Sequence, residues 1–169
     1  MITVTLGTIP YSFERTIAWL NALLDRKVIN EPIFVQYGIT DISPIASHPL
    51  VTAQSIVEST ELLALVKRSR LILSHAGQGS TRMLAAEGAS FVLIPRLSRY
   101  KEHVDDHQLL FAQNVQHFGV RYCLHLKEVE DAILHPPPPF QGQLFSGPKL
   151  PDYLRSLYAQ RSYPQRLKR

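Results

Sequence analysis

The chain has 169 residues, of which 45% are hydrophobic and 19% are charged. This length and composition suit one globular domain with a buried core, and they exclude an intrinsically disordered chain. The net charge of +4 fits a polyanionic ligand, an anionic membrane surface or nucleic acid, and does not choose among them.

Short apolar strands alternate with amphipathic helices along the chain. In chain order we expect a strand at 2–6, a helix at 12–27, strands at 33–37 and 50–54, a helix from 59, a strand at 71–73, a helix after 81 to about 87, a strand at 91–94, a helix at 104–118, a strand at 122–124 and a helix at 127–134. Ser12 and Ser59 are predicted to cap the first two helices.

This alternation predicts a Rossmann-like α/β fold, in which a parallel sheet is covered by helices on both faces. Such sheets bind ligands outside the carboxyl ends of their strands. Gly7, Gly38, the segment 74–81 and the loop 96–103 all fall at those ends. The sequence therefore predicts a binding site at this edge of the sheet.

Four consecutive prolines, Pro136 to Pro139, are predicted to end the compact domain. We expect a domain over 1–135, followed by a proline-rich segment and basic tail over 136–169. Residues 152–160 fit a short helix. The basic residues near the end fit either a solvated tail or a segment attracted to an anionic membrane or a partner.

A glycine-rich segment with the sequence Ser-His-Ala-Gly-Gln-Gly-Ser-Thr occupies residues 74–81. Glycines let the backbone approach a ligand closely, and a helix N-terminus offers free N–H groups and a positive dipole end. We predict a diphosphate site here. Its candidate residues are His75, Gly77, Gln78, Gly79, Ser80 and Thr81. A plain tight turn, with His75 as a buried structural residue, is the alternative.

Charged and polar residues form a second candidate group in and after the loop that follows the strand at 91–94. Its members are Arg96, His103, Asp106, His107 and Gln108, with Arg99, Lys101 and Asp105 among them. The carboxylates and amide suit sugar hydroxyls, and the basic side chains suit phosphate. An ordinary charged helix start is the alternative. Gly7 and Thr8, after the first strand, are a third candidate, with a simple turn as the alternative.

Several kinds of site and segment are not expected. Cys123 is the only cysteine, which excludes an intramolecular disulfide, favours a reducing compartment and suits a small buried residue. We identify no Cys/His spacing typical of a metal site. The first residues do not resemble a signal peptide, and no apolar run reaches the roughly 18 residues of a membrane span.

The glycine segment, Ile-Pro-Arg at 94–96 and Glu-His-Val-Asp-Asp-His-Gln at 102–108 together resemble the C-terminal domain of glycosyltransferase family 28. The resemblance covers residue 1 to about 134. It is strongest to PssE-type exopolysaccharide transferase subunits. The small subunit of the dolichol-pathway N-acetylglucosaminyltransferase and the single-chain enzyme that forms lipid II are also similar.

The resemblance implies the C-terminal half of a GT-B fold that holds a UDP-sugar donor. The turn 77–81 would bind the diphosphate, and residues 106–108 would face the donor sugar. Gly7 and Thr8 would border the cleft between domains. Transfer would invert the anomeric centre, with no cofactor or bound metal, while the helix N-terminus stabilises the leaving diphosphate.

One position departs from the family pattern. In the single-chain relative, a glutamate in the helix after the glycine turn holds the ribose, and the matching residue here is Met83. Arg82 or Glu87 would have to compensate. This departure favours an alternative function, a non-catalytic nucleotide-sugar-binding regulatory or scaffold protein.

A GT-B enzyme needs two such domains, and 169 residues have room for one. We therefore expect a heteromer with a membrane-anchored, PssD-like subunit that binds the acceptor and carries the general base. The acceptor would be a lipid-linked sugar, and the chain would be a cytoplasmic protein recruited to the inner membrane face. A nucleic-acid-binding module is a third class, suggested only by the basic charge, and no recognition-helix pattern supports it.

Overall fold

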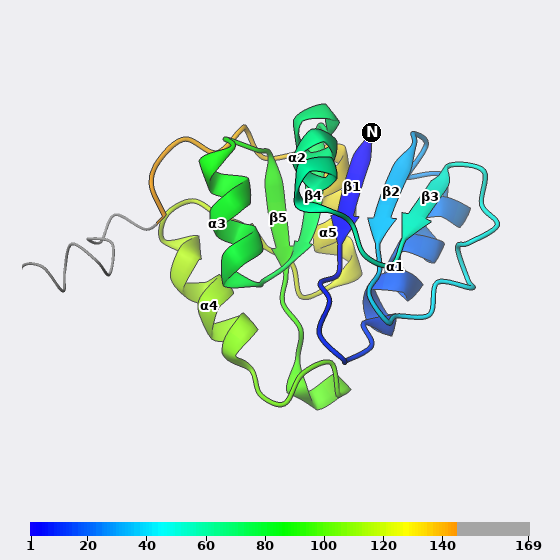
Figure 1. Cartoon of the computed structure of the whole chain (residues 1–169), viewed down its shortest axis with the longest axis horizontal. Coiled ribbons are helices and arrows are strands. Elements are labelled where there is room, and N and C mark those ends of the chain that lie inside the picture. Colours follow the sequence, from blue (N-terminus) through cyan, green and yellow to red (C-terminus); the bar gives the residue numbers. More distant parts are fainter. Residues whose placement is uncertain (145–169) are drawn as a thin grey trace, which may run out of the picture.

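Six short parallel strands form one sheet with the order β3-β2-β1-β4-β5-β6 in the computed structural model, which describes residues 1–144 (Figure 1). The strands are β1 (Ile2–Thr5), β2 (Ile33–Gln36), β3 (Val51–Gln54), β4 (Leu71–His75), β5 (Phe91–Ile94) and β6 (Arg121–Tyr122). The helices are α1 (Glu14–Asp25), α2 (Ser59–Arg68), α3 (Gln78–Ala86), α4 (His107–Gln116) and α5 (Leu126–Leu134), with a short 3-10 helix at Ser98–Tyr100. The predicted parallel α/β architecture is confirmed.

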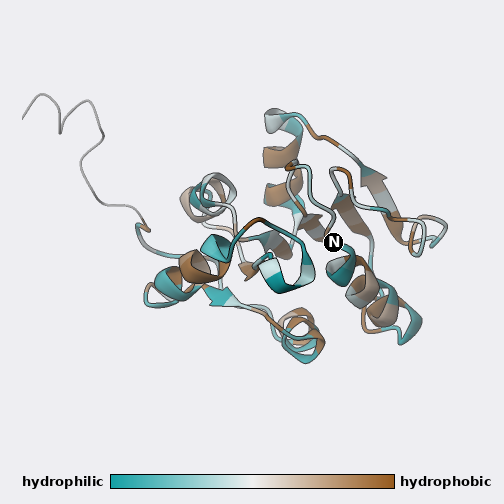
Figure 2. Ribbon diagram, turned by 90° about the horizontal axis from the view of Figure 1, so that it is seen from below, coloured by the Kyte–Doolittle hydropathy of each residue, from teal (hydrophilic) through white to brown (hydrophobic). Residues whose placement is uncertain are grey.

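Helices cover both faces of the sheet, because successive side chains of each strand point to opposite faces and both are apolar. One core cluster joins Val4 and Leu73 to α1 and α5. A second joins Ile72 and Leu93 to α2, α3 and α4. These three helices lie together on one face of the sheet, and α1 and α5 lie on the other (Figures 1 and 2). Within residues 1–144, no helix is long and apolar enough to cross a membrane.

The strand order reverses between β1 and β4. From β1 the chain builds β2 and β3 on one side, and it then crosses to add β4 on the other. Thr5 pairs with Ser74 at the carboxyl ends of these two strands, and their hydroxyl oxygens lie 3.0 Å apart. A reversal of this kind opens a crevice between the loops that follow the two strands, which is the usual ligand site of such sheets.

Neither predicted serine cap is observed. The N-cap of α1 is Phe13, whose backbone N–H donates to Thr40 Oγ1 at 3.1 Å, while the Ser12 hydroxyl donates to Glu14. Helix α2 begins at Ser59 itself, one residue after its N-cap. At α1, the contact between Phe13 and the distant Thr40 overrides the local preference for a serine cap.

The compact unit continues past the boundary that the sequence predicts at residue 135. The Ser90 hydroxyl donates to the Pro137 carbonyl at 2.6 Å, and Phe140 N donates to Ala89 O at 3.0 Å. Leu144 is only 7% exposed and belongs to the second core cluster. Residues 137–144 therefore contact the compact unit, and where the domain ends stays a prediction. The predicted helix at 152–160 and the basic tail lie outside the described residues.

Replacing Leu144 with alanine tests this longer boundary. We expect a loss of about 2 kcal/mol in the free energy of unfolding, since the substitution removes a buried side chain and leaves a cavity. Leu134→Ala is the matched control, because Leu134 is 57% exposed and should change stability by less than about 0.5 kcal/mol. Urea unfolding measures both variants. Equal losses in the free energy of unfolding for the two variants would place the end of the domain at residue 135.

Candidate functional site

A cavity of about 200 Å³ lies at the carboxyl ends of β1 and β4, where the strand order reverses. Residues from the loop after β1, the end of β4 and the start of α3 line it. They are Thr5, Gly7, Thr8, Ile9, Gln36, Val57, Leu62, His75 and Ser80. Four of the predicted site residues therefore meet around one cavity: Gly7, Thr8, His75 and Ser80.

The His75 ring lies against two of the predicted glycines. A Cβ atom added to Gly77 would come within 2.4 Å of His75 Nε2, and one added to Gly7 would come within 3.0 Å of the same atom. Gly7 also has a φ of +83°, which side chains rarely adopt. Both glycines are therefore required by the packing of His75, as well as by any ligand that approaches the turn.

His75 is a neutral hydrogen-bonding group. Its Nδ1 lies 3.2 Å from the Thr5 carbonyl, and because a carbonyl only accepts, Nδ1 must carry the proton. Nε2 is then an acceptor. Burial of the ring, with a smaller contribution from the nearby charge of Arg96, lowers the pKa of His75 to about 4. At neutral pH the cavity therefore contains an uncharged imidazole and not a cation.

The lowered pKa of His75 predicts a pH dependence of stability. Between pH 6.5 and about 4 the unfolded chain binds a proton that the folded chain does not, so stability falls as the pH falls through this range. The slope should approach 1.4 kcal/mol per pH unit at most, about the value for one proton. Urea unfolding at several pH values, compared with His75→Asn, measures it. If the stability of the two proteins changes with pH in the same way, protonation of His75 is not the cause.

Gln36, which no sequence motif predicts as a site residue, positions the loop after β1. Its Oε1 accepts from Gly7 N at 3.1 Å, and its Nε2 donates to Gly7 O at 3.1 Å and to Ser55 O at 2.9 Å. The side chain is buried, at 6% exposed. A polar residue at the end of an apolar strand was the available signal. Gln36 therefore fixes the backbone that forms one wall of the cavity.

The N-terminus of α3 forms the other wall. Gly77 is the N-cap, and the helix begins at Gln78 and Gly79, which are both exposed. The first N–H groups of a helix have no acceptor within that helix, so they are available to an anion. The structure corrects the predicted role of Thr81 in the diphosphate site. Its hydroxyl is buried and donates to the Gly77 carbonyl at 2.9 Å. It stabilises the first turn and offers no donor to a ligand.

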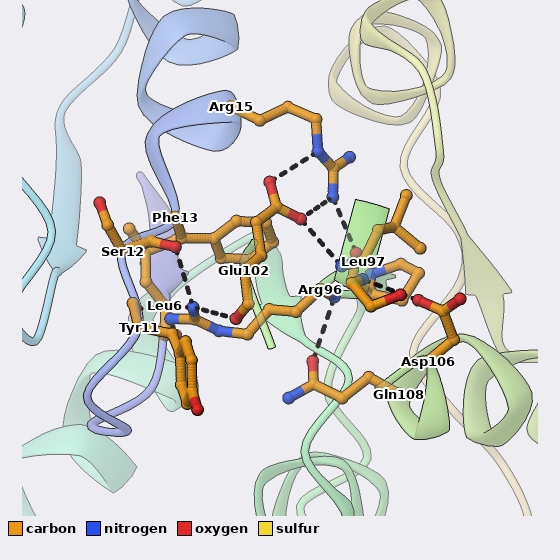
Figure 3. A network of polar contacts seen from close by, with 12 residues as sticks. Leu6, Tyr11, Ser12, Phe13, Arg15, Arg96, Leu97, Glu102, Asp106 and Gln108 are labelled. Atoms are coloured by element: carbon orange, nitrogen blue, oxygen red, sulfur yellow. Dashed lines mark hydrogen bonds and ion pairs between the residues drawn. The ribbon is translucent and has the colours of Figure 1, made fainter. Parts of the chain in front are cut away.

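The structure also corrects the role predicted for Arg96. The sequence suggested a side chain that contacts phosphate, but Arg96 is only 1% exposed. Its Nη2 donates to Leu6 O at 2.7 Å, and its Nη1 lies 2.8, 3.3 and 3.1 Å from three further carbonyls (Figure 3). Those three belong to Tyr11, Ser12 and Glu102. Burial lowers the pKa of Arg96 to about 10, so the guanidinium stays charged and ties the loop after β1 to the loop after β5.

A buried ion pair supports the same junction. Arg15 Nε and Nη2 donate to the two carboxylate oxygens of Glu102 at 2.9 and 2.8 Å, and Leu97 N donates to the second oxygen at 2.9 Å (Figure 3). The Arg96 guanidinium lies 4.5 Å from the centre of the Phe13 ring. Two arginines and one carboxylate therefore hold the loop 96–102 against the start of α1.

The remaining members of the second group lie in the segment that leads into α4. Asp106 is exposed, and its Oδ1 accepts from Ser98 N at 2.7 Å. Gln108 is buried, and its Oε1 accepts from Arg96 N at 3.2 Å. His107 is exposed and lies beside His103. Asp106 and His107 are thus accessible to a ligand, whereas Gln108 already serves the loop.

The two predicted groups are neighbours that the segment after β1 connects. No residue of 96–108 lines the cavity between β1 and β4. The Tyr11 ring, however, stacks on the His103 ring with centroids 5.6 Å apart. Arg96 reaches the carbonyls on either side of that segment. A ligand lying across the segment would therefore contact α3 at one end and the start of α4 at the other.

Met83 has no carboxylate, and the carboxylate of Glu87 lies away from the crevice. Met83 packs against the second core cluster. Glu87 is the C-cap of α3, about 13 Å from the start of that helix, and its carboxylate lies 3.6 Å from Lys67 Nζ. The compensation that the sequence suggested for Glu87 is therefore not supported.

Comparison with known proteins supports the fold. A solved glycosyltransferase of kitacinnamycin covers 94% of this chain with a TM-score of 0.53 and 17% identity. The glycosyltransferase SnogD from Streptomyces nogalater covers 94% with a TM-score of 0.52 and 18% identity. No curated protein sequence matches the chain.

This chain spans well under half of either structure, at 38% and 43% of their lengths. At such low identity the likeness shows the shared fold alone. The family model called the glycosyltransferase family 28 C-terminal domain matches residues 1–137. By that match over most of its length, the chain belongs to glycosyltransferase family 28, through its C-terminal domain.

Proposed function

We propose that this domain binds the UDP-sugar donor of a two-component inverting glycosyltransferase, which extends a polyprenyl-diphosphate-linked sugar in exopolysaccharide biosynthesis. The observation that carries the proposal is the cavity at the reversal of strand order, with the N-terminus of α3 on one side and the loop after β1 on the other. Family membership supplies the reaction class.

The start of α3 suits a diphosphate. Backbone N–H groups and the positive end of the helix dipole favour an anion there, and exposed Gly79 leaves its approach open, since a Cβ at that position would meet nothing within 4 Å. Ser80 lines the cavity beside them. His75 adds an uncharged acceptor, which suits a donor N–H or hydroxyl of the ligand.

The donor sugar would extend from the diphosphate toward the second group. Asp106 and His107 are exposed at the start of α4 and offer a carboxylate and an imidazole to sugar hydroxyls. Thr8, exposed after β1, would border the opening. Glucose, galactose, glucuronic acid and N-acetylglucosamine all present hydroxyls that such groups bind.

A second surface would complete the site. The cavity of about 200 Å³ is smaller than the roughly 300–1,000 Å³ typical of small-molecule sites. The solved glycosyltransferases are more than twice as long as the part that this chain matches. We assign the missing surface to a membrane-anchored, PssD-like subunit that binds the lipid-linked acceptor and brings this chain to the inner membrane face.

The proposed reaction is an in-line displacement. A base on the partner takes the proton of the acceptor hydroxyl, whose oxygen attacks the anomeric carbon from the side opposite the diphosphate. The bond from that carbon to the diphosphate oxygen breaks, and its electron pair stays with UDP. The N–H groups at the start of α3 would stabilise the charge that develops there, a role that needs no metal.

Calorimetry with the chain and UDP tests donor binding. We expect UDP and at least one UDP-sugar to bind, and ADP and CMP to bind at least tenfold more weakly. The same titrations with the co-expressed partner should show tighter UDP-sugar binding. Absence of UDP binding both with and without the partner would refute the donor role. Strong turnover of a lipid-linked acceptor by the isolated chain would refute the two-component arrangement alone.

A non-catalytic role is the second candidate, and Met83 favours it. The helix offers no carboxylate at the position where the resemblance leads us to expect ribose recognition, and Glu87 is engaged at the far end of α3. A scaffold of this kind would bind UDP-sugar yet give no product with any partner. Product formation by the reconstituted pair would exclude it.

A further inference from the structure

Three potential metal ligands converge where the chain leads into α4. His103, Asp105 and His107 alternate along the chain, and their ligand atoms all lie within 4.8 Å of one another. The carboxylate oxygen Oδ1 of Asp105 lies 3.4 Å from His103 Nδ1 and also contacts His107 Nδ1. The two imidazole rings meet edge to face, with centroids 4.3 Å apart.

One of these ligands is already held in place. The His103 side chain is 14% exposed and stacks on Tyr11, which belongs to the segment after β1. Its Nδ1 atom is buried, and within residues 1–144 it has no hydrogen-bond partner. Buried polar atoms are almost always satisfied, which makes this nitrogen a candidate ligand atom.

We propose that His103, Asp105 and His107 form a binding site for a divalent transition metal such as Zn²⁺. Two neutral imidazoles and one carboxylate give a donor set with a net charge of −1, which suits a dication. Water would take the fourth position. Asp105 and His107 are exposed, so both can move toward a shared ion.

The required movement is small. Zinc lies about 2.0–2.1 Å from imidazole nitrogen and takes a tetrahedral arrangement, which places neighbouring ligand atoms about 3.4 Å apart. The present separations run from 2.5 Å to at most 4.8 Å, and rotation of the two exposed side chains about a fixed His103 would bring them to that value.

The site shares His107 with the proposed sugar contact, but metal binding needs neither nucleotide nor partner and is tested apart from the proposed function. The experiment uses the full chain without an affinity tag, freed of metal by chelation. Co²⁺ is followed by its visible absorption and Zn²⁺ by calorimetry, both at pH 7.5. We expect one equivalent to bind, and Asp105→Asn and His107→Ala each to weaken binding at least tenfold. Both side chains are exposed, so both variants should fold, which circular dichroism checks.

His135→Ala is the matched control. His135 is also exposed and also pairs with an aspartate, because its Nδ1 lies 3.0 Å from Asp131 Oδ1, but it stands at the end of α5. Its removal should leave the affinity unchanged. The proposal is overturned if the unaltered chain binds no metal, if His107→Ala binds as tightly as that chain, or if His135→Ala weakens binding as much as His107→Ala.

Discussion

Replacement of Arg96 by methionine is expected to lower the free energy of unfolding by about 3–5 kcal/mol, the largest effect on stability of any substitution proposed for this chain. Methionine keeps an unbranched apolar stem and removes the guanidinium. The change therefore tests the charged group and its hydrogen bonds, and not the filling of the core.

The expected loss of stability follows from the hydrogen bonds that Arg96 donates. Its two terminal nitrogens donate to backbone carbonyls of Leu6, Tyr11, Ser12 and Glu102, and the first and last of these are separated by 96 positions in the chain. Without the guanidinium, buried carbonyls lose charged donors, and each such loss carries a desolvation cost. Glu102 would also lose a neighbouring positive charge.

Arg99→Met provides the control. Arg99 lies three residues further along, is exposed, and places its guanidinium 4.8 Å from the centre of the Tyr100 ring. Its loss should cost less than about 1 kcal/mol. Urea unfolding of the three proteins at pH 7 makes the comparison. If the two variants lose equal stability, the carbonyl contacts of Arg96 contribute little.

The sheet could be predicted because its strands are apolar on both faces. Ile2–Thr5, Leu71–His75 and Phe91–Ile94 are short runs that a helix-covered parallel sheet accounts for directly. The meeting of Gly7 and Gly77 at one edge followed from the same logic, since carboxyl ends of parallel strands share that edge. Local sequence is sufficient for features of this kind.

Roles that depend on distant partners could not be predicted. Arg96 follows a strand in a charged loop, where an exposed cation is the ordinary expectation, and its partners stand up to 90 positions away. Thr81 looked like a donor to a ligand, yet its hydroxyl bonds within its own turn. The packing of Leu144 against the second core cluster likewise has no signal in the four prolines.

Replacement of Gly79 by alanine is expected to have opposite effects on stability and on binding. Gly79 is the second residue of α3, and a Cβ there would meet nothing within 4 Å. The change should raise the free energy of unfolding by about 0.5–1 kcal/mol, since alanine favours the helix. It should also weaken UDP binding at least tenfold, because the methyl group would occupy the approach to the helix N-terminus.

Gly119→Ala is the contrasting control. Its Cβ would also lie in open space, but its φ is +88°, so alanine there is strained. We expect a loss of about 1–2 kcal/mol in stability with no change in UDP affinity. Gly119 precedes β6 and stands at the amino end of that strand, on the other edge of the sheet from the cavity.

Together the two variants separate a stability effect from a binding effect. Thermal unfolding and UDP calorimetry on each protein give four values, in which the more stable variant should be the weaker binder. A Gly79→Ala protein that binds UDP with unchanged affinity would contradict a diphosphate at the start of α3, even if UDP binds elsewhere on the chain. The donor would then have to be sought along the segment 103–108, where Asp106 and His107 are exposed.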